Sequence, residues 1–232
     1  VRALLRKMVE LFPSPAEARP EVGRRPGLDQ EVTLMAEDDG PLAALVFKTA
    51  TEPHVGELTY FRIFSGGLAN GLAVHNATRD ADEKFNRLSV PQGKERLEVD
   101  RLHAGDIGVV AKLKDSHTND TFSDGDRPLV LEPISFPEPD ISVALKGATR
   151  ADEDKLGAVL PRIQDEDPTF QAAYEAELGQ TIARGMGELH LDVQIERMKR
   201  KYDVEVTTER PRVAYRETIT RSGQAQARHK KQ

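Results

Sequence analysis

The short stretch GMGELH, from Gly185 to His190, contains residue types that are common in phosphate-binding and metal-binding sites. Two glycines before a helix can present free N–H groups to a phosphate, and Glu188 and His190 are possible metal ligands. The spacing differs from HExxH, however, and the sequence shows no third ligand. A tight strand-to-helix turn explains both glycines. The sequence therefore predicts neither a metal site nor a phosphate site here.

Other residues that could do chemistry do not form a catalytic pattern. Four histidines are scattered between positions 54 and 117: His54, His75, His103 and His117. No acid and nucleophile accompany them in the order that a triad requires. Three consecutive acids stand at a helix end, where the helix dipole disfavours them: Asp165, Glu166 and Asp167. We interpret these acids as a solvated helix end, and we predict no catalytic residue.

The helix after GMGELH carries two neighbouring stripes. The apolar stripe follows the 3.6-residue period: Leu191, Ile195, Met198 and Tyr202. The polar stripe repeats the spacing one residue earlier: His190, Gln194, Arg197 and Lys201. The apolar stripe is expected to lie on a sheet. The polar stripe is either a solvated face or an interface with a partner, and its chemistry alone favours the solvated face.

Composition excludes several classes of protein. The 232 residues contain no cysteine, which rules out disulfides, thiolate metal sites and a cysteine nucleophile. No apolar run approaches the roughly 20 residues of a membrane span, and no signal-peptide core is present, so a cytoplasmic protein is expected. The net charge of −6 argues against a globally basic nucleic-acid binder, although the last residues, RSGQAQARHKKQ, are basic.

The chain divides into segments of different texture. An amphipathic helix is expected over residues 1–12, docked on another element, and a Pro- and Gly-rich linker over 13–39. Short alternating segments from 41 to 133 predict an all-β barrel or sandwich. From residue 137 onward, the pattern of apolar residues predicts the order β-α-β-β-α-β. This order is typical of a ferredoxin-like unit, with both helices on one face of a four-stranded sheet.

Two local features complicate this division. Pro161 falls inside the first helix of the ferredoxin-like unit, so a kink or an early helix end is expected there. The segment PRVAYRETIT, from Pro211 to Thr220, begins as a new strand that closes no unit. Both ends of the chain look cut from something larger.

Several segments, in this order, resemble elongation factor G, the translational GTPase that drives tRNA and mRNA movement on the ribosome: PLAALVFKTATEPHVGELTYFRIFSGGL, AGDIGVV, FPEPDISVAL, GQTIARGMGELHLDVQIERMKRKYDVEV and VAYRETIT. The resemblance implies a multi-domain β and α+β fold, a translation-factor β-barrel followed by a ferredoxin-like domain. Its limits would be 1–31 for the end of a GTPase domain and linker, 32–136 for the barrel, 137–211 for the ferredoxin-like domain, and 212–232 for the start of a fourth domain.

The resemblance also assigns roles to residues. In the family, one helix face borders the GTPase domain and the pocket of the inhibitor fusidic acid, which implies an interdomain or inhibitor-facing set: Pro139, His190, Gln194, Arg197 and Lys201. Gln194 stands where the family usually has an aliphatic residue. The basic end would face rRNA: Arg228, His229, Lys230 and Lys231.

The resemblance predicts GTP and Mg²⁺ only for the complete parent, because the chain lacks GxxxxGK[ST] and NKxD segments. Expected partners are the ribosome, the parent's GTPase domain and its domains IV and V, with the protein a monomer. Three alternatives remain: a ribosomal-protection protein or other paralogue, a stand-alone RNA-binding module, and a small hydrolase built on the ferredoxin-like unit.

Overall fold

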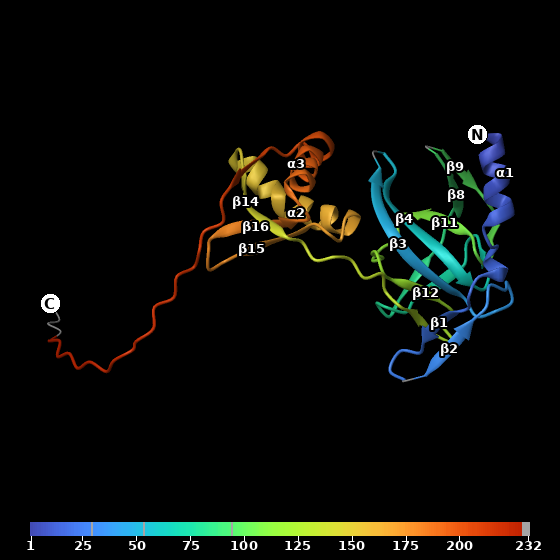
Figure 1. The fold of residues 1–232 in the computed structure, drawn as a ribbon, viewed down its shortest axis with the longest axis horizontal. Coiled ribbons are helices and arrows are strands. Elements are labelled where there is room, and N and C mark those ends of the chain that lie inside the picture. The colour runs from blue at the N-terminus through green and yellow to red at the C-terminus, as the bar shows by residue number, and fades with distance from the viewer. Residues whose placement is uncertain (29, 53, 94, 229–232) are drawn as a thin grey trace.

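A computed structural model describes residues 1–28, 30–52, 54–93 and 95–228. A β-rich domain comes first, an α+β domain follows, and an extended segment leads to the C-terminus (Figure 1). Among the described residues, no helix has the length and apolar character needed to cross a bilayer.

The β-rich domain is built around one eight-stranded sheet of order β7-β6-β12-β3-β4-β11-β8-β9. Its strands are β3 (Ala43–Glu52), β4 (Gly56–Ser65), β6 (Ala73–Asn76), β7 (Ala81–Lys84), β8 (Ser89–Gln92), β9 (Glu95–Glu98), β11 (Ile107–Ala111) and β12 (Thr121–Ser123). Alternate residues of β4 point into the core, as a half-buried strand requires. Phe61, Phe85 and Phe122 meet there, with ring centroids 4.9–6.0 Å apart. These aromatic contacts supply much of the apolar burial of this domain.

Residues 13–39 are not the plain linker that their Pro and Gly content suggested. A short 3-10 helix, η1 (Pro15–Glu17), leads to β1 (Glu21–Arg24) and β2 (Glu31–Leu34). These strands form a hairpin in a three-stranded sheet with β13 (Val130–Leu131), and β5 (Leu68–Ala69) pairs with β10 (Arg101–Leu102). The linker prediction is wrong because Leu34 is buried and packs against the β-rich core, which gives the hairpin a hydrophobic anchor.

The predicted N-terminal helix is present as α1 (Arg2–Leu11). No residue of α1 is buried, so the expected docking of its apolar face is not seen in the structure. Leu4, Leu5 and Phe12 keep more than half of their surface exposed.

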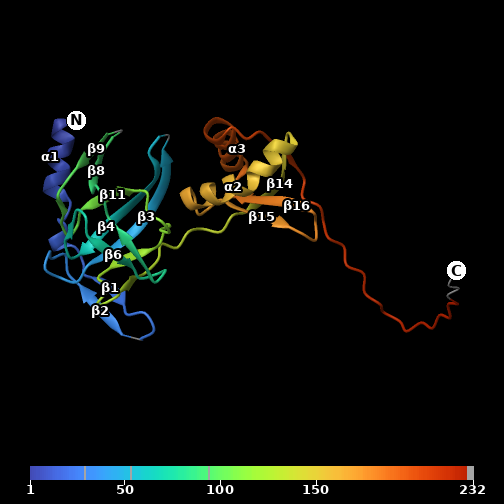
Figure 2. The same cartoon turned by 180° about the vertical axis from the view of Figure 1, so that it is seen from behind.

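The α+β domain has the predicted β-α-β-β-α-β order. Its elements are β14 (Ile141–Gly147), α2 (Arg150–Glu166), β15 (Gln171–Glu175), β16 (Gln180–Gly185), α3 (Glu188–Tyr202) and β17 (Val206–Glu209). The sheet order is β15-β16-β14-β17, with each pair antiparallel. Both helices lie on the same face of this sheet (Figure 2).

Local chemistry fixes both helices. Thr149 caps α2 and forms a capping box with Asp152. The predicted inner face of α2 is buried: Leu156, Val159, Leu160 and Ile163. Along α3, Leu191 and Met198 are buried, while Ile195 and Tyr202 are partly buried in the same core, which confirms the predicted apolar stripe. This packing fixes the orientation of α3, so its polar stripe lies toward the end of α2.

Helix α2 does not end at Pro161, so the predicted early end is wrong. The helix continues to Glu166, and the amide of Asp167 still donates to Ile163 O at its end. Leu160 and Ile163 are buried on either side of the exposed proline. Their burial offsets the local cost of the ring, which is about 3 kcal/mol in a helix interior.

The strand expected from Pro211 is also not found, since the structure assigns no strand to residues 211–228. Arg216 pairs with Glu177, and Arg212 donates to Gln180 Oε1 and Leu178 O. A strand needs a neighbouring strand to satisfy its backbone groups, and these side-chain contacts do not supply one.

Candidate functional site

The carboxyl end of helix α2 gathers the polar residues that the sequence singled out. We call residues 165–167 the acidic end of α2. The interpretation of these acids as a solvated helix end is wrong, because the side chain of Glu166 is only 4% exposed and that of Asp167 only 24%. The acids lie between the β-rich domain on one side and α3 on the other.

Glu166 joins both sides through one carboxylate. Its Oε2 accepts from Arg197 Nη2 at 2.8 Å, and its Oε1 pairs with Lys201 and accepts from the hydroxyl of Tyr202. The same Oε1 accepts the backbone N–H of Thr51, on strand β3, at 2.7 Å. Two cations of α3 thus compensate a buried charge that also binds the end of strand β3 in the β-rich domain.

The electrostatics of Glu166 follow from these contacts. Burial raises the pKa of this carboxyl, but the hydrogen bonds from Lys201 and Thr51 lower it by more, so its pKa lies below the ordinary value of 4.5. Glu166 is therefore ionised at neutral pH.

Asp167 receives the other half of the polar stripe. Its Oδ2 lies 2.9 Å from His190 Nε2 and accepts from Gln194 Nε2 at 2.6 Å, while the hydroxyl of Thr169 donates to Oδ1. The backbone N–H of Met186 donates to His190 Nδ1, which leaves Nε2 as the ring's donor toward Asp167. Gln194 is 2% exposed, so the solvated-face interpretation of the stripe is wrong.

The pKa of Asp167 is also displaced. Burial raises it, whereas hydrogen bonds from Thr169 and His190 lower it by more, and the net pKa lies below 3.8. Asp167 thus remains a charged acceptor for His190 and Gln194.

Asp165 faces the β-rich domain. Its Oδ1 lies 2.9 Å from His117 Nδ1, and its backbone carbonyl accepts the hydroxyls of Thr49 and Thr118. The other ring nitrogen of His117, Nε2, lies 3.0 Å from Asp115 Oδ1. The end of α2 is therefore attached to two separate segments of the β-rich domain.

A cavity of about 210 Å³ lies at this junction and is lined by Thr49, Thr51, Gly56, Glu57, Arg162, Asp165 and Glu166. Burial and the charge of Asp165 raise the pKa of Glu57, which lies on strand β4. Among the residues that the structure describes, no group of three or more His, Asp or Glu side chains has the arrangement of a metal site. The cavity is a polar gap between two domains, with an excess of carboxylates.

The sequence contained the signal for this cluster but not the partners. The acids and the polar stripe have matching chemistry, yet Asp167 and Glu166 are separated from their α3 partners by 23 to 36 positions. Only the packing of both helices on one sheet brings them together.

Two family descriptions match the chain. Residues 41–125 match elongation factor G domain 2, and residues 136–210 match elongation factor G, domain III. This chain belongs to the elongation factor G family. A crystal structure of a protein from Thermus thermophilus is similar, with a TM-score of 0.73 and 32% sequence identity over 91% of this chain. The chain spans 29% of the length of that protein.

These matches confirm the predicted fold class: a β-rich elongation factor G domain followed by an α+β domain III of βαββαβ order. In the terms of the family, the acidic end of α2 lies in domain III and His117 lies in domain II. The junction described above is therefore a contact between domains II and III.

The remaining residues that the resemblance singled out lie elsewhere. Pro139 is half-buried in the segment before β14, and the described contacts do not bring it to the acidic end of α2. Arg228 is exposed in the extended C-terminal segment. His229, Lys230 and Lys231 lie outside the described residues. Their predicted contact with rRNA stays a prediction.

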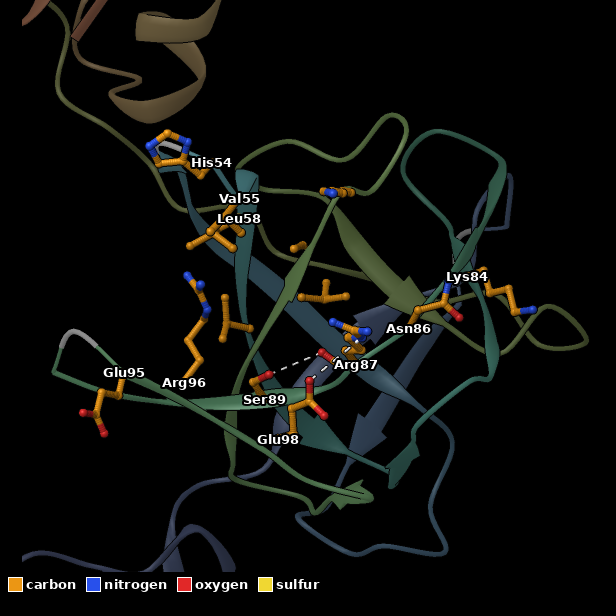
Figure 3. A pocket seen from close by; sticks show the side chains of 14 residues that line it. His54, Val55, Leu58, Lys84, Asn86, Arg87, Ser89, Glu95, Arg96 and Glu98 are labelled. Atoms are coloured by element: carbon orange, nitrogen blue, oxygen red, sulfur yellow. Dashed lines mark hydrogen bonds and ion pairs between the residues drawn. The ribbon is translucent and has the colours of Figure 1, made fainter.

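Domain II also carries a groove of about 920 Å³ that the sequence did not indicate (Figure 3). Leu58, Val109 and Val110, all nearly fully buried, contribute to its lining. Charged side chains surround them: Lys84, Arg87, Glu95, Arg96, Glu98 and Lys112. Arg87 and Glu98 approach to 3.9 Å. The groove is lined by residues of β4, β8, β9 and β11. These strands are neighbours in the order of the sheet, which sequence spacing does not reveal.

Proposed function

We propose that this chain is the central part of an elongation factor G-like translational GTPase that promotes GTP-dependent translocation of tRNA and mRNA on the ribosome. Domains II and III would bind the ribosome and transmit the state of the GTPase domain to the rest of the factor. The proposed limits are 1–31 for the end of the GTPase domain and the segment that leads into domain II, 32–136 for domain II, 137–211 for domain III, and 212–232 for the start of domain IV.

The observation that carries this proposal is the double attachment of Glu166. Its carboxylate accepts the Thr51 amide of domain II and simultaneously pairs with Arg197 and Lys201 of α3. A displacement of α3 changes the position of the carboxylate, and the carboxylate holds strand β3. Modest interfaces of this polar kind permit domains to re-dock as units.

The chemistry of GTP hydrolysis belongs to another part of the proposed factor. GTP and Mg²⁺ would bind to the GTPase domain of the parent, which is expected to be the hydrolase, and this chain would act without a cofactor of its own. Partners of the cytoplasmic, monomeric parent would be the ribosome and its own GTPase domain, with domains IV and V.

A single-round translocation assay tests the proposal. The complete factor would carry Glu166→Gln, which keeps the shape of the side chain and removes its charge. The rate of mRNA movement should fall on the order of tenfold, because two cations lose their counter-charge at the domain junction. The matched control is Glu196→Gln on α3, since the Glu196 side chain is 69% exposed.

Three outcomes are informative. An unchanged rate in the Glu166→Gln factor would contradict the transmission role. A complete wild-type protein that binds ribosomes without moving mRNA would instead indicate a paralogue such as a ribosomal-protection protein. A complete protein without ribosome binding would remove the proposal altogether.

A further inference from the structure

The loop between β11 and β12, residues 112–120, is preformed on domain II. The carboxylate of Glu83, a residue only 3% exposed, accepts the backbone amides of Lys114 and Asp115 and the hydroxyl of Ser116. A buried carboxylate with three donors fixes the first half of the loop. His117 therefore projects from a rigid base.

The second half of the β11–β12 loop is fixed in the same way. Asp120, 2% exposed, accepts the amide of His117 at 2.9 Å and pairs with Arg79. Asn119 exchanges two hydrogen bonds with the backbone of Ile134, at the start of the segment that leads to domain III. The loop thus contacts both the connecting segment and, through His117 and Thr118, the end of α2.

His117 occupies a position that suits the imidazolium form. Nδ1 lies 2.9 Å from Asp165 Oδ1 on α2, and Nε2 lies 3.0 Å from Asp115 Oδ1 on its own loop. A carboxylate can only accept, so both ring nitrogens must donate to satisfy both contacts. The neutral ring has one N–H and leaves a lone pair facing a carboxylate.

Other charged side chains also lie near the imidazole ring of His117. Arg79, from the turn after β6, lies 3.7 Å from Asp115 and opposes protonation of the ring. Glu57 of β4 and Arg162 of α2 line the adjacent cavity with Asp165. Glu166 follows Asp165 at the end of α2, and its two cations, Arg197 and Lys201, are on α3. The two carboxylates that contact the ring favour its protonation more than the single, more distant Arg79 disfavours it.

We propose that His117 is a proton-controlled clasp between domains II and III, closed when the imidazole is protonated and weakened when it is neutral. This inference rests on the proposed role of the junction in transmission, but it concerns the chain alone. Thr49 and Thr118 still donate to the carbonyl of Asp165 in the neutral state, so loss of the proton loosens the junction without opening it fully.

The direction of the pH effect follows from the ring's surroundings. Burial lowers the pKa of His117, but the contacts with Asp115 and Asp165 raise it by more, so the pKa lies above 6.5. A group whose pKa is raised by docking stabilises the docked state below its free pKa. That stabilisation is lost as the pH rises through the docked pKa.

The test measures the distance between the domains in the 232-residue chain. Because the chain has no cysteine, Gln92→Cys on β8 and Asp154→Cys on α2, both at exposed positions, give one clean label pair. Single-molecule energy transfer between the two labels reports the interdomain distance. Measurements from about pH 5.5 to 8.5 cover the titration range of a histidine. The docked-to-loosened ratio should fall on the order of fivefold across this range.

Substitutions test whether the pH dependence of the interdomain distance comes from the imidazole of His117. His117→Gln and Asp165→Asn should each remove the pH dependence, and their circular dichroism reports whether both domains remain folded. His75→Gln is the matched control, because His75 bonds to Asp82 within domain II. A pH-independent distance in the parent chain, or a pH dependence that survives His117→Gln, would overturn the clasp. Translocation by the complete factor can succeed or fail independently of either result.

Discussion

Glu166 is the single residue on which the junction depends most: two cations compensate its charge, and its carboxylate contacts both domains. Its side chain is nearly fully buried, and it is the shared acceptor for Thr51, Arg197 and Lys201. Charge pairs of this kind contribute to orientation more than to net stability, because desolvation offsets most of the attraction. Removal of the charge is costly all the same, since the two cations are left without compensation.

Glu166→Gln should lower the free energy of unfolding of domain III by about 2 kcal/mol. Urea unfolding followed by circular dichroism measures the change. Glu196→Gln on the exposed side of α3 should cost less than about 0.5 kcal/mol, because a surface pair contributes little. Equal effects of the two substitutions would contradict the assigned role of Glu166.

The acid side of the stability profile should also depend on the acidic end of α2. The pKa values of Glu166 and Asp167 lie below their ordinary values of 4.5 and 3.8. Groups of this kind stabilise the fold above their unfolded pKa, and the contribution is lost as the pH falls through the lower folded pKa.

Melting temperatures of the chain should therefore decline below about pH 4.5, and the Glu166→Gln variant should decline less steeply over that interval. Identical acid profiles of the two proteins would show that Glu166 carries no such linkage.

At the level of helices and strands, close approach between β14 and α2 sets the geometry of the site. An added Cβ at Gly147 would lie 2.4 Å from the backbone nitrogen of Glu153. Helix α2 thus begins directly against the end of β14. Its length then determines where Glu166 meets domain II.

Gly147→Ala should destabilise domain III by about 1–3 kcal/mol, because the backbone of α2 must move. Gly157→Ala, within α2, meets no atom within 4 Å and should stabilise the helix by about 1 kcal/mol. Urea unfolding of the two variants should give changes of opposite sign. Tolerance of alanine at position 147 would show that the β14–α2 contact is looser than described.

The same elements show what the sequence could predict. The apolar period predicted the inner face of α2 correctly. On α3 it predicted Leu191 and Met198 correctly, but Ile195 and Tyr202 are only partly buried and Gln194 is buried as well. The early helix end at Pro161 and the linker over residues 13–39 were wrong predictions, because local propensity was weighed without tertiary burial. The polar stripe was visible, but its partner was not, since periodicity describes one helix at a time.

At the level of the whole chain, a polar junction connects two domains that each have their own core. One apolar cluster contains the three phenylalanines of domain II, and another contains Leu191, Met198 and their neighbours in domain III. The contacts that join the domains at the end of α2 are hydrogen bonds and ion pairs. Such a junction can change without unfolding either core.

Amide hydrogen exchange at Thr51 tests most directly whether Glu166 holds strand β3 of domain II. The Thr51 N–H donates to Glu166 Oε1 at 2.7 Å, so we predict a protected amide in the parent chain and in Glu196→Gln, and faster exchange in Glu166→Gln. A Thr51 amide that exchanges in the parent chain as fast as in an unstructured peptide would contradict the account.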